Sequence, residues 1–129
     1  MERKEVTILF DRIFISNSEI GIHRDRTYGF GAVFGFRTLR GVPFLHLAKK
    51  VKAAYLGADT PSHKGWPAQQ TALQWFVDKG LEGLYQLPEC VRLRPGPNGT
   101  YHMVNGSHRA LALYILGETH VRARVGGAN

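Results

Sequence analysis

The chain has 129 residues, a length that suits one domain built around one hydrophobic core. Apolar residues make up 43% of it and charged residues 21%, a globular composition that excludes a disordered chain. Seventeen Lys and Arg against ten Asp and Glu give a net charge of +7, which favours an anionic partner: nucleic acid, a nucleotide or an acidic protein surface.

The sequence also carries signals about its compartment. No apolar run approaches the roughly 20 residues that a helix needs to cross a bilayer, so we expect no membrane partner. Asp11 and Arg12 interrupt the apolar run near the start, which argues against a secretory signal. The single cysteine, Cys90, leaves no internal disulfide, fits a reducing compartment and is expected to be a small buried apolar residue. We therefore expect a cytoplasmic protein.

The first part of the chain is predicted to be rich in strands. Residues 6–15 alternate enough to form one or two strands. Residues 28–39 alternate glycine with phenylalanine, which predicts a further strand that is bent or closely approached on its glycine side. Residues 43–56 place apolar side chains at helical spacing and predict a helix with its lysines facing solvent.

A loop and a second helix follow. Residues 57–67 contain two prolines and two glycines and predict a loop, which holds Lys64. Residues 68–79 predict a helix that Gly80 ends.

The last part of the chain predicts a hairpin, a helix and a strand. Residues 89–94 predict a strand, and residues 101–104 are expected to pair antiparallel with its residues 91–94, because Asn98-Gly99 between them is a strong hairpin signal. Residues 107–116 predict a helix closed by glycine, and residues 121–125 a final strand with arginines on its polar side. Together the elements predict one compact α+β domain over residues 1–129, a mixed sheet with flanking helices.

The most informative segment is the turn from Gly106 to Arg109, where a predicted strand runs through glycine directly into a helix. Free N–H groups at the helix start would meet the hydroxyl of Ser107, the imidazole of His108 and the guanidinium of Arg109. The positive end of the helix dipole lies at the same place. Such a group of donors suits a phosphate or another anion.

Other interpretations of these side chains remain open. Arg109 would also be satisfied by a nearby carboxylate such as Glu118 or Glu89. His108 would serve equally as a satisfied core or cap residue, since its pKa allows either donor pattern. Lys64 either closes over the phosphates or lies in an exposed loop.

The hairpin, the glycine turn with Ser-His-Arg, the alanine-rich helix, the glycine stop and the Val-Arg-Ala-Arg-Val strand resemble the core of the ParB/sulfiredoxin superfamily. The likeness is strongest over residues 87–125. It implies a nucleoside triphosphate bound at the turn. Gly106 would let the backbone approach the phosphates, Ser107 and His108 would supply donors, Arg109 a planar charge, and Asn105 would orient the turn or contact the ligand.

The resemblance supports a class of ligand better than a reaction. Sulfiredoxins need a cysteine where this chain has Ser107, so sulfinic acid reduction is not expected. Nucleotide or phosphoester hydrolysis, as in an ATPase or nuclease, would need a carboxylate to hold Mg²⁺ or take a proton. The candidates are Asp11, Glu19, Asp25 and Glu89. Of these we name Asp25, together with His108, as catalytic.

Two further hypotheses compete with a nucleotide site. The first is a non-catalytic regulator of phage or plasmid type that binds a host protein through a basic and aromatic surface. Exposure of Trp66, Tyr28 or Phe30 would favour it. The second is sequence-independent DNA binding, which would weaken steeply with salt. A zinc site is not expected, because the six histidines lack paired ligand spacing and the chain has one cysteine.

Overall fold

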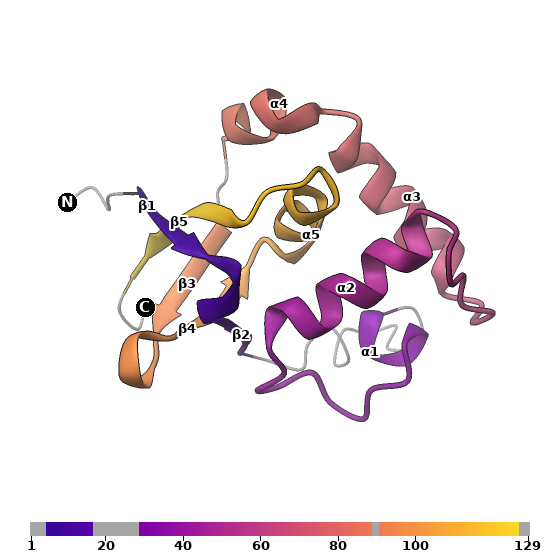
Figure 1. Cartoon of the computed structure of the whole chain (residues 1–129), viewed down its shortest axis with the longest axis horizontal. Helices are drawn as coiled ribbons and strands as arrows, with labels where there is room; N and C mark the ends of the chain where they lie inside the picture. The colour runs from indigo at the N-terminus through magenta and orange to yellow at the C-terminus, as the bar shows by residue number, and fades with distance from the viewer. Residues whose placement is uncertain (1–4, 17–28, 89–90, 127–129) are drawn as a thin grey trace.

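A five-stranded mixed sheet is the framework of the fold in the computed structural model, which describes residues 5–16, 29–88 and 91–126. The strands are β1 (Glu5–Leu9), β2 (Ile13–Ile15), β3 (Val91–Pro95), β4 (Tyr101–Asn105) and β5 (His120–Val125). They lie in the order β1-β5-β3-β4-β2 (Figure 1). The β1–β5 and β3–β4 pairs are antiparallel, whereas β3–β5 and β2–β4 are parallel.

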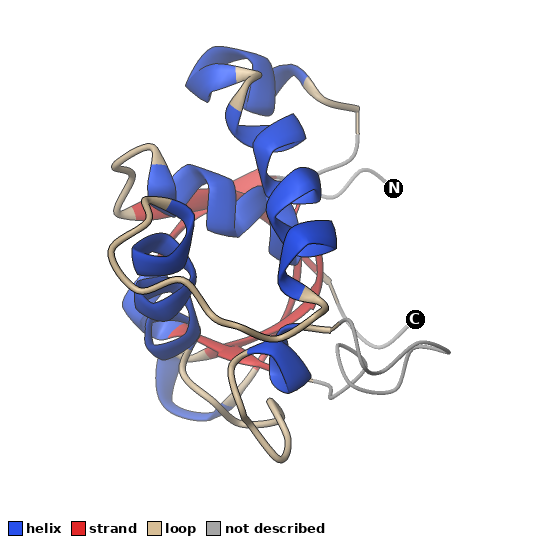
Figure 2. Cartoon of the chain, turned by 90° about the vertical axis from the view of Figure 1, so that its right-hand side faces the viewer, coloured by secondary structure: helices blue, strands red, loops and turns tan. Residues whose placement is uncertain are grey.

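The helices gather on one side of this sheet, as Figures 1 and 2 show. They are α1 (Phe30–Val33), α2 (Phe44–Tyr55), α3 (Trp66–Val77), α4 (Gly80–Gln86) and α5 (Ser107–Ile115). Two 3₁₀ turns, η1 (Phe10–Arg12) and η3 (Pro97–Gly99), link β1 to β2 and β3 to β4. Together the sheet and helices confirm the expected α+β class.

Helix α5 lies at the centre of the core. It packs against β3 and β5 and against α2 and α3. Four consecutive residues, Ala110 to Leu113, are fully buried, so this helix is covered on all sides rather than along one stripe. Ala110 and Ala112 have small side chains that permit close packing, which fixes the position of the first turn of α5 relative to the sheet.

The sheet is apolar on its inner side and basic on its outer side. Along β5, Val121 and Ala123 are buried while Arg122 and Arg124 are exposed, as a strand with one covered face requires. The same alternation runs along β3, residues 91–95. The predicted polar side of the last strand is thereby confirmed.

The predicted hairpin is also confirmed. Arg94 lies opposite His102 in the antiparallel β3–β4 pair. The turn between the strands places Asn98 at φ 57° and Gly99 at φ 74°. Asparagine and glycine tolerate this left-handed region better than other residues, which is why the dipeptide is a hairpin signal.

The prediction of a strand over residues 28–39 is wrong. The described part of that range begins with the short helix α1, and Tyr28 lies outside the described residues. Phe30 and Phe34 are four residues apart, a spacing that fits a helix as well as an alternating strand. Their rings stack at 6.4 Å between centroids, so the phenylalanine pattern serves an aromatic contact within one turn.

The remaining helices differ from expectation mainly at their ends. The helix predicted over residues 43–56 is α2 and the one predicted over residues 68–79 is α3, which begins earlier, at Trp66 with Pro67 in its first turn. Gly80, at φ 71°, separates α3 from α4, a helix that the sequence pattern did not predict. Cys90 lies outside the described residues.

Candidate functional site

The turn between β4 and α5 has the geometry that the sequence predicted. Gly106 adopts the left-handed conformation, with φ 92° and ψ 25°, and α5 starts at the next residue. Asn105 accepts a hydrogen bond from the N–H of Gly106 at 2.8 Å, so its side chain orients the turn, one of the two roles expected for it. The β3–β4 pairing is irregular just before this point and brings Asn105 opposite Arg92.

Gly106 is also packed tightly against β3. A Cβ atom added to it would lie 2.9 Å from the Cα of Val91 and 3.0 Å from its Cγ2. Both the positive φ and this close approach exclude a larger residue. The glycine therefore seats the turn against the sheet, which is a structural reason independent of any ligand.

The first turn of α5 carries the three predicted donors. Ser107, His108 and Arg109 are all half-buried, and no side chain of the described residues caps this helix. Its first intrahelical hydrogen bond is that of the Ala110 N–H, which donates to the Gly106 carbonyl at 2.9 Å. The preceding N–H groups belong to the helix start, where backbone donors lack intrahelical partners. Arg109 has an interaction partner within the chain.

His108 is held in an aromatic cluster. Its ring lies 5.2 Å from that of Phe30 and is stacked on that of Phe76 at 6.1 Å. Its Nε2 atom is 2.8 Å from Oε1 of Gln69, and because an amide oxygen only accepts, Nε2 carries the proton. Burial lowers the pKa of His108, so the imidazole is neutral at pH 7. It is a hydrogen-bonding group rather than a cation.

The same cluster connects the starts of α5 and α3. Gln69 lies in the first turns of α3 and His108 in the first turn of α5, so their contact brings the two helix starts together. Trp66, the first residue of α3, contacts the ring of Phe34 at 5.8 Å, and Phe34 stacks on Phe30. The buried indole N–H of Trp66 has no acceptor among the described residues.

Lys64 lies two residues before α3 and is exposed. It has an interaction partner within the chain. The loop is tied down next to it, since His63 Nδ1 accepts a hydrogen bond from the Gly65 N–H at 2.9 Å. Lys64 is thus on the segment that leads into the helix contacting His108.

Of the four carboxylates predicted for catalysis, only Asp11 belongs to the described residues. Asp25, Glu19 and Glu89 lie outside the described residues, and Asp11 is exposed on η1. Within residues 5–16, 29–88 and 91–126, no three His, Cys, Asp or Glu side chains are grouped as metal ligands. The predicted catalytic roles of Asp25 and His108 are therefore not tested by the geometry.

Sequence reasoning missed two partners of His108. Phe30 lies in the range predicted as a strand. Gln69 lies at the start of a predicted helix, and no sequence pattern indicates its contact with His108. Phe76 packs against the core, and the apolar character of this residue in a predicted helix is the one signal that pointed to the cluster. The pairing of Gln69 with His108 joins residues 39 positions apart and has no local signature.

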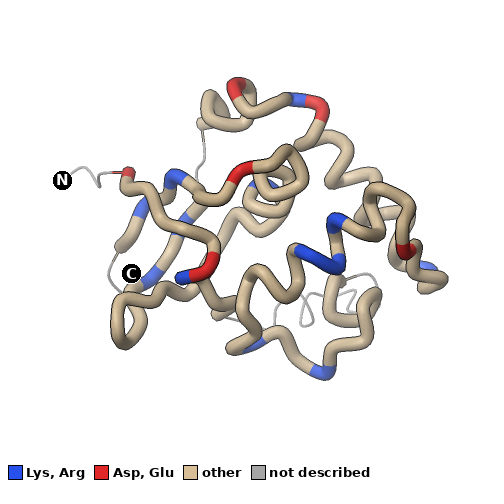
Figure 3. Tube along the Cα trace, in the orientation of Figure 1, with Lys and Arg blue, Asp and Glu red and all other residues tan. Residues whose placement is uncertain are grey.

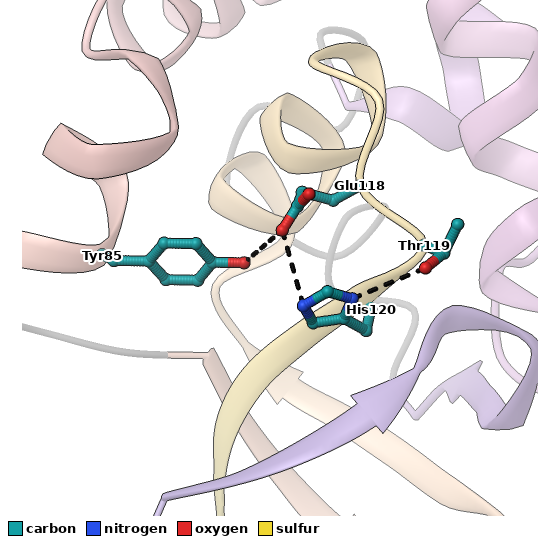
Figure 4. Close-up of polar contacts among 4 residues, drawn as sticks. All are labelled: Tyr85, Glu118, Thr119 and His120. Atoms are coloured by element: carbon teal, nitrogen blue, oxygen red, sulfur yellow. Dashed lines mark hydrogen bonds and ion pairs between the residues drawn. The ribbon is translucent and has the colours of Figure 1, made fainter.

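A second polar cluster lies at the end of α5, away from the predicted turn (Figure 4). Tyr85 donates a hydrogen bond to Glu118 at 2.8 Å, and the same carboxylate oxygen is 3.5 Å from Nε2 of His120. Burial and the Glu118 carboxylate raise the pKa of Tyr85 to about 12. The guanidinium of Arg122 lies over the Tyr85 ring, 3.8 Å from its centroid. This cluster anchors α4 to β5.

The chain matches no protein-family model, and comparisons with curated proteins and with solved structures likewise give no match. None of the helices in the described ranges is both long and apolar enough to span a membrane.

We expect acid to destabilise the domain through His108. The unfolded chain binds a proton at a pKa of about 6.5, whereas the folded chain binds it less readily. The stabilising contribution is therefore present above pH 6.5 and is lost as the pH falls through the lower folded pKa. Melting curves between pH 8 and pH 4.5 should show a smaller loss of stability for His108→Gln than for the parent protein. Equal losses in both would contradict the assignment.

Proposed function

We propose that the protein binds the phosphate of a nucleotide or nucleic acid at the turn from Gly106 to Arg109, with a nucleoside triphosphate as the cofactor class. One observation carries this proposal. A nine-residue helix begins directly after a left-handed glycine, with no side-chain cap from the described residues. Its first N–H groups and its dipole favour an anion at this end.

Neighbouring side chains support the same ligand class. Arg109 adds a guanidinium in the first turn of α5, where an anion would compete with its present partner. Ser107 adds a hydroxyl, and Lys64 lies on the segment entering α3. The net charge of +7 also attracts anions, and it does so over a longer range.

Turnover is a second and separable part of the proposal. The reaction would be metal-assisted phosphoester hydrolysis, with His108 and Asp25 in catalytic roles and Mg²⁺ as the metal. The neutral imidazole of His108, held by Gln69, suits proton acceptance at Nδ1 rather than electrostatic binding of a phosphate. A cytoplasmic location belongs to the same proposal.

Two of the aromatic residues whose exposure would have favoured a host-protein regulator are buried. Trp66 is 3% exposed and Phe30 is 1% exposed, and both pack inside the aromatic cluster. Trp75 is 54% exposed, but Lys79 lies over its ring at 4.1 Å. The start of α5, which no side chain in the described part of the chain caps, favours the nucleotide proposal.

Ligand binding should appear as a rise in thermal stability. A ligand that binds only the folded state at 100 times its Kd stabilises that state by about 2.7 kcal/mol. We expect such a shift with ATP, CTP, GTP or a short DNA, each titrated with and without Mg²⁺. Arg109→Gln should remove most of the shift that the nucleotides cause, because it deletes the charged donor at the helix start.

Lys50→Gln is the matched control, since it removes one positive charge from the exposed side of α2. It should keep the parent shift. The proposal fails if the parent protein melts at the same temperature with every one of these ligands.

A further inference from the structure

A second basic surface lies on the outward side of the sheet, on the two strands next to each other at its middle. We call it the arginine face. It consists of Arg92 and Arg94 on β3 and Arg122 and Arg124 on β5. All four side chains are exposed and alternate with buried apolar residues, and the guanidinium of Arg122 also lies over the Tyr85 ring. Figure 3 shows the basic positions following β3 and β5, separate from a second group along α2.

The parallel register of β3 and β5 arranges these four charges as a track. Arg92 of β3 lies beside Arg124 of β5. Arg122 precedes this pair by two residues on β5, and Arg94 follows it by two residues on β3. Residues on one side of a strand repeat every 6.6 Å or so, and neighbouring strands are about 4.8 Å apart. The arginine face is therefore about 13 Å long and only two strands wide.

The described residues around this track supply little compensating negative charge. Like charges side by side on a sheet destabilise it. None of the four guanidinium groups forms an ion pair with a carboxylate among the described residues. Glu5, opposite Arg124 on β1, is the one carboxylate at an outward position of the described β1, β3 and β5. An elongated excess of guanidinium groups is complementary to a polyanion with regularly spaced charges.

Aromatic side chains lie next to the arginine face, on the β4 side of β3. Arg94 lies opposite His102 of β4, and His102 lies opposite Phe14 of β2, so the three form a row across the sheet. Phe14 is half-buried and lies between Ile13 and Ile15, which face the core, so it belongs to the outward side. Phe14 and His102 thus offer flat groups beside the cationic track.

We propose that the arginine face binds single-stranded nucleic acid, with phosphates on the guanidinium groups and bases stacked on Phe14 and His102. Open sheets that combine cations with rings bind single strands because unpaired bases can stack on the rings. A duplex keeps its bases stacked within itself, and the described outward side presents no helix to enter a major groove. The surface goes beyond the function proposed above, because it does not use the start of α5.

Fluorescence anisotropy with labelled oligo-dT, oligo-U and a duplex of equal length tests this proposal across a range of salt concentrations. We expect both single strands to bind more tightly than the duplex. The double variant Arg92→Gln/Arg124→Gln should weaken single-strand binding and make the slope of log K against log salt shallower by about 1.4, or about 0.7 for each lost phosphate contact. Phe14→Leu should weaken binding about fivefold with the slope unchanged.

The double variant Lys49→Gln/Lys50→Gln removes the same charge from α2 and should bind single strands as the parent does. The proposal is overturned if the parent protein binds neither single strand at low salt. It is equally overturned if the duplex binds as tightly as the single strands, or if the lysine and arginine variants lose affinity alike.

Measuring both single-strand binding and the nucleotide-dependent melting shift in each variant distinguishes the two surfaces. Arg109→Gln should keep single-strand binding to the arginine face and lose the nucleotide-dependent melting shift. The arginine double variant should keep that melting shift. Loss of single-strand binding in Arg109→Gln, with the arginine double variant unaffected, would place the nucleic acid at the start of α5 and overturn the inference about the sheet.

Discussion

Replacement of Gly106 by alanine is expected to lower the free energy of unfolding by about 2–5 kcal/mol. Two effects add. An alanine must adopt φ 92°, a conformation that residues with a Cβ rarely take. Its Cβ would also lie 2.9 Å from the Cα of Val91, so β3 or the start of α5 must move. Denaturant unfolding followed by circular dichroism measures the change.

Gly117→Ala is the control that separates these two effects. Gly117 also has a positive φ, of 101°, but a Cβ added there would meet nothing within 4 Å. Its substitution should show the conformational effect alone and destabilise less than Gly106→Ala. Equal losses of unfolding free energy in the two variants would mean that the structure relieves the contact with Val91 without further loss of stability.

Replacement of Leu111 by alanine is expected to destabilise the domain by about 2–5 kcal/mol. Leu111 is fully buried on α5, the helix that contacts the sheet and the helices α2, α3 and α4. The substitution removes apolar contacts and leaves a cavity that the close-packed core fills only partly. The free energy of unfolding from denaturant melts is again the measurement.

Leu56→Ala provides the comparison for Leu111. Leu56 follows the end of α2 and is 63% exposed, so its truncation should change stability by no more than about 0.5 kcal/mol. If Leu111→Ala were as mild as Leu56→Ala, α5 would not be the centre of the core.

The elements with strong local signals were predictable from the sequence. The hairpin follows from Asn98-Gly99, whose residues adopt the positive φ values that such a turn requires. The end of α5 follows from Gly117, and the apolar spacing of residues 44–54 identifies α2. Each of these signals depends on residues within a few positions of each other. The order of the strands has no such local signal, because β5 lies between β1 and β3 through pairings distant in the sequence.

The candidate site was predictable only in its backbone. The left-handed glycine and the helix start at Ser107 follow from the local sequence. The orientation of His108 does not, because Gln69 and the ring of Phe30 reach it from other helices. The phenylalanines spaced four apart in residues 30–34 fit two periodicities, and only packing against His108 and Trp66 distinguishes them. Tertiary contacts thus decide what local preference leaves open.

The pairing of β1 with β5 has a consequence for how the molecule is made. Glu5 lies opposite Arg124, so β1 must wait for a strand that is synthesised more than a hundred residues later. At elongation rates of about 5–20 residues per second, that delay is roughly ten seconds on the ribosome. During that time the backbone N–H and C=O groups of β1 have no partner strand, so β1 stays an unpaired strand until β5 is made.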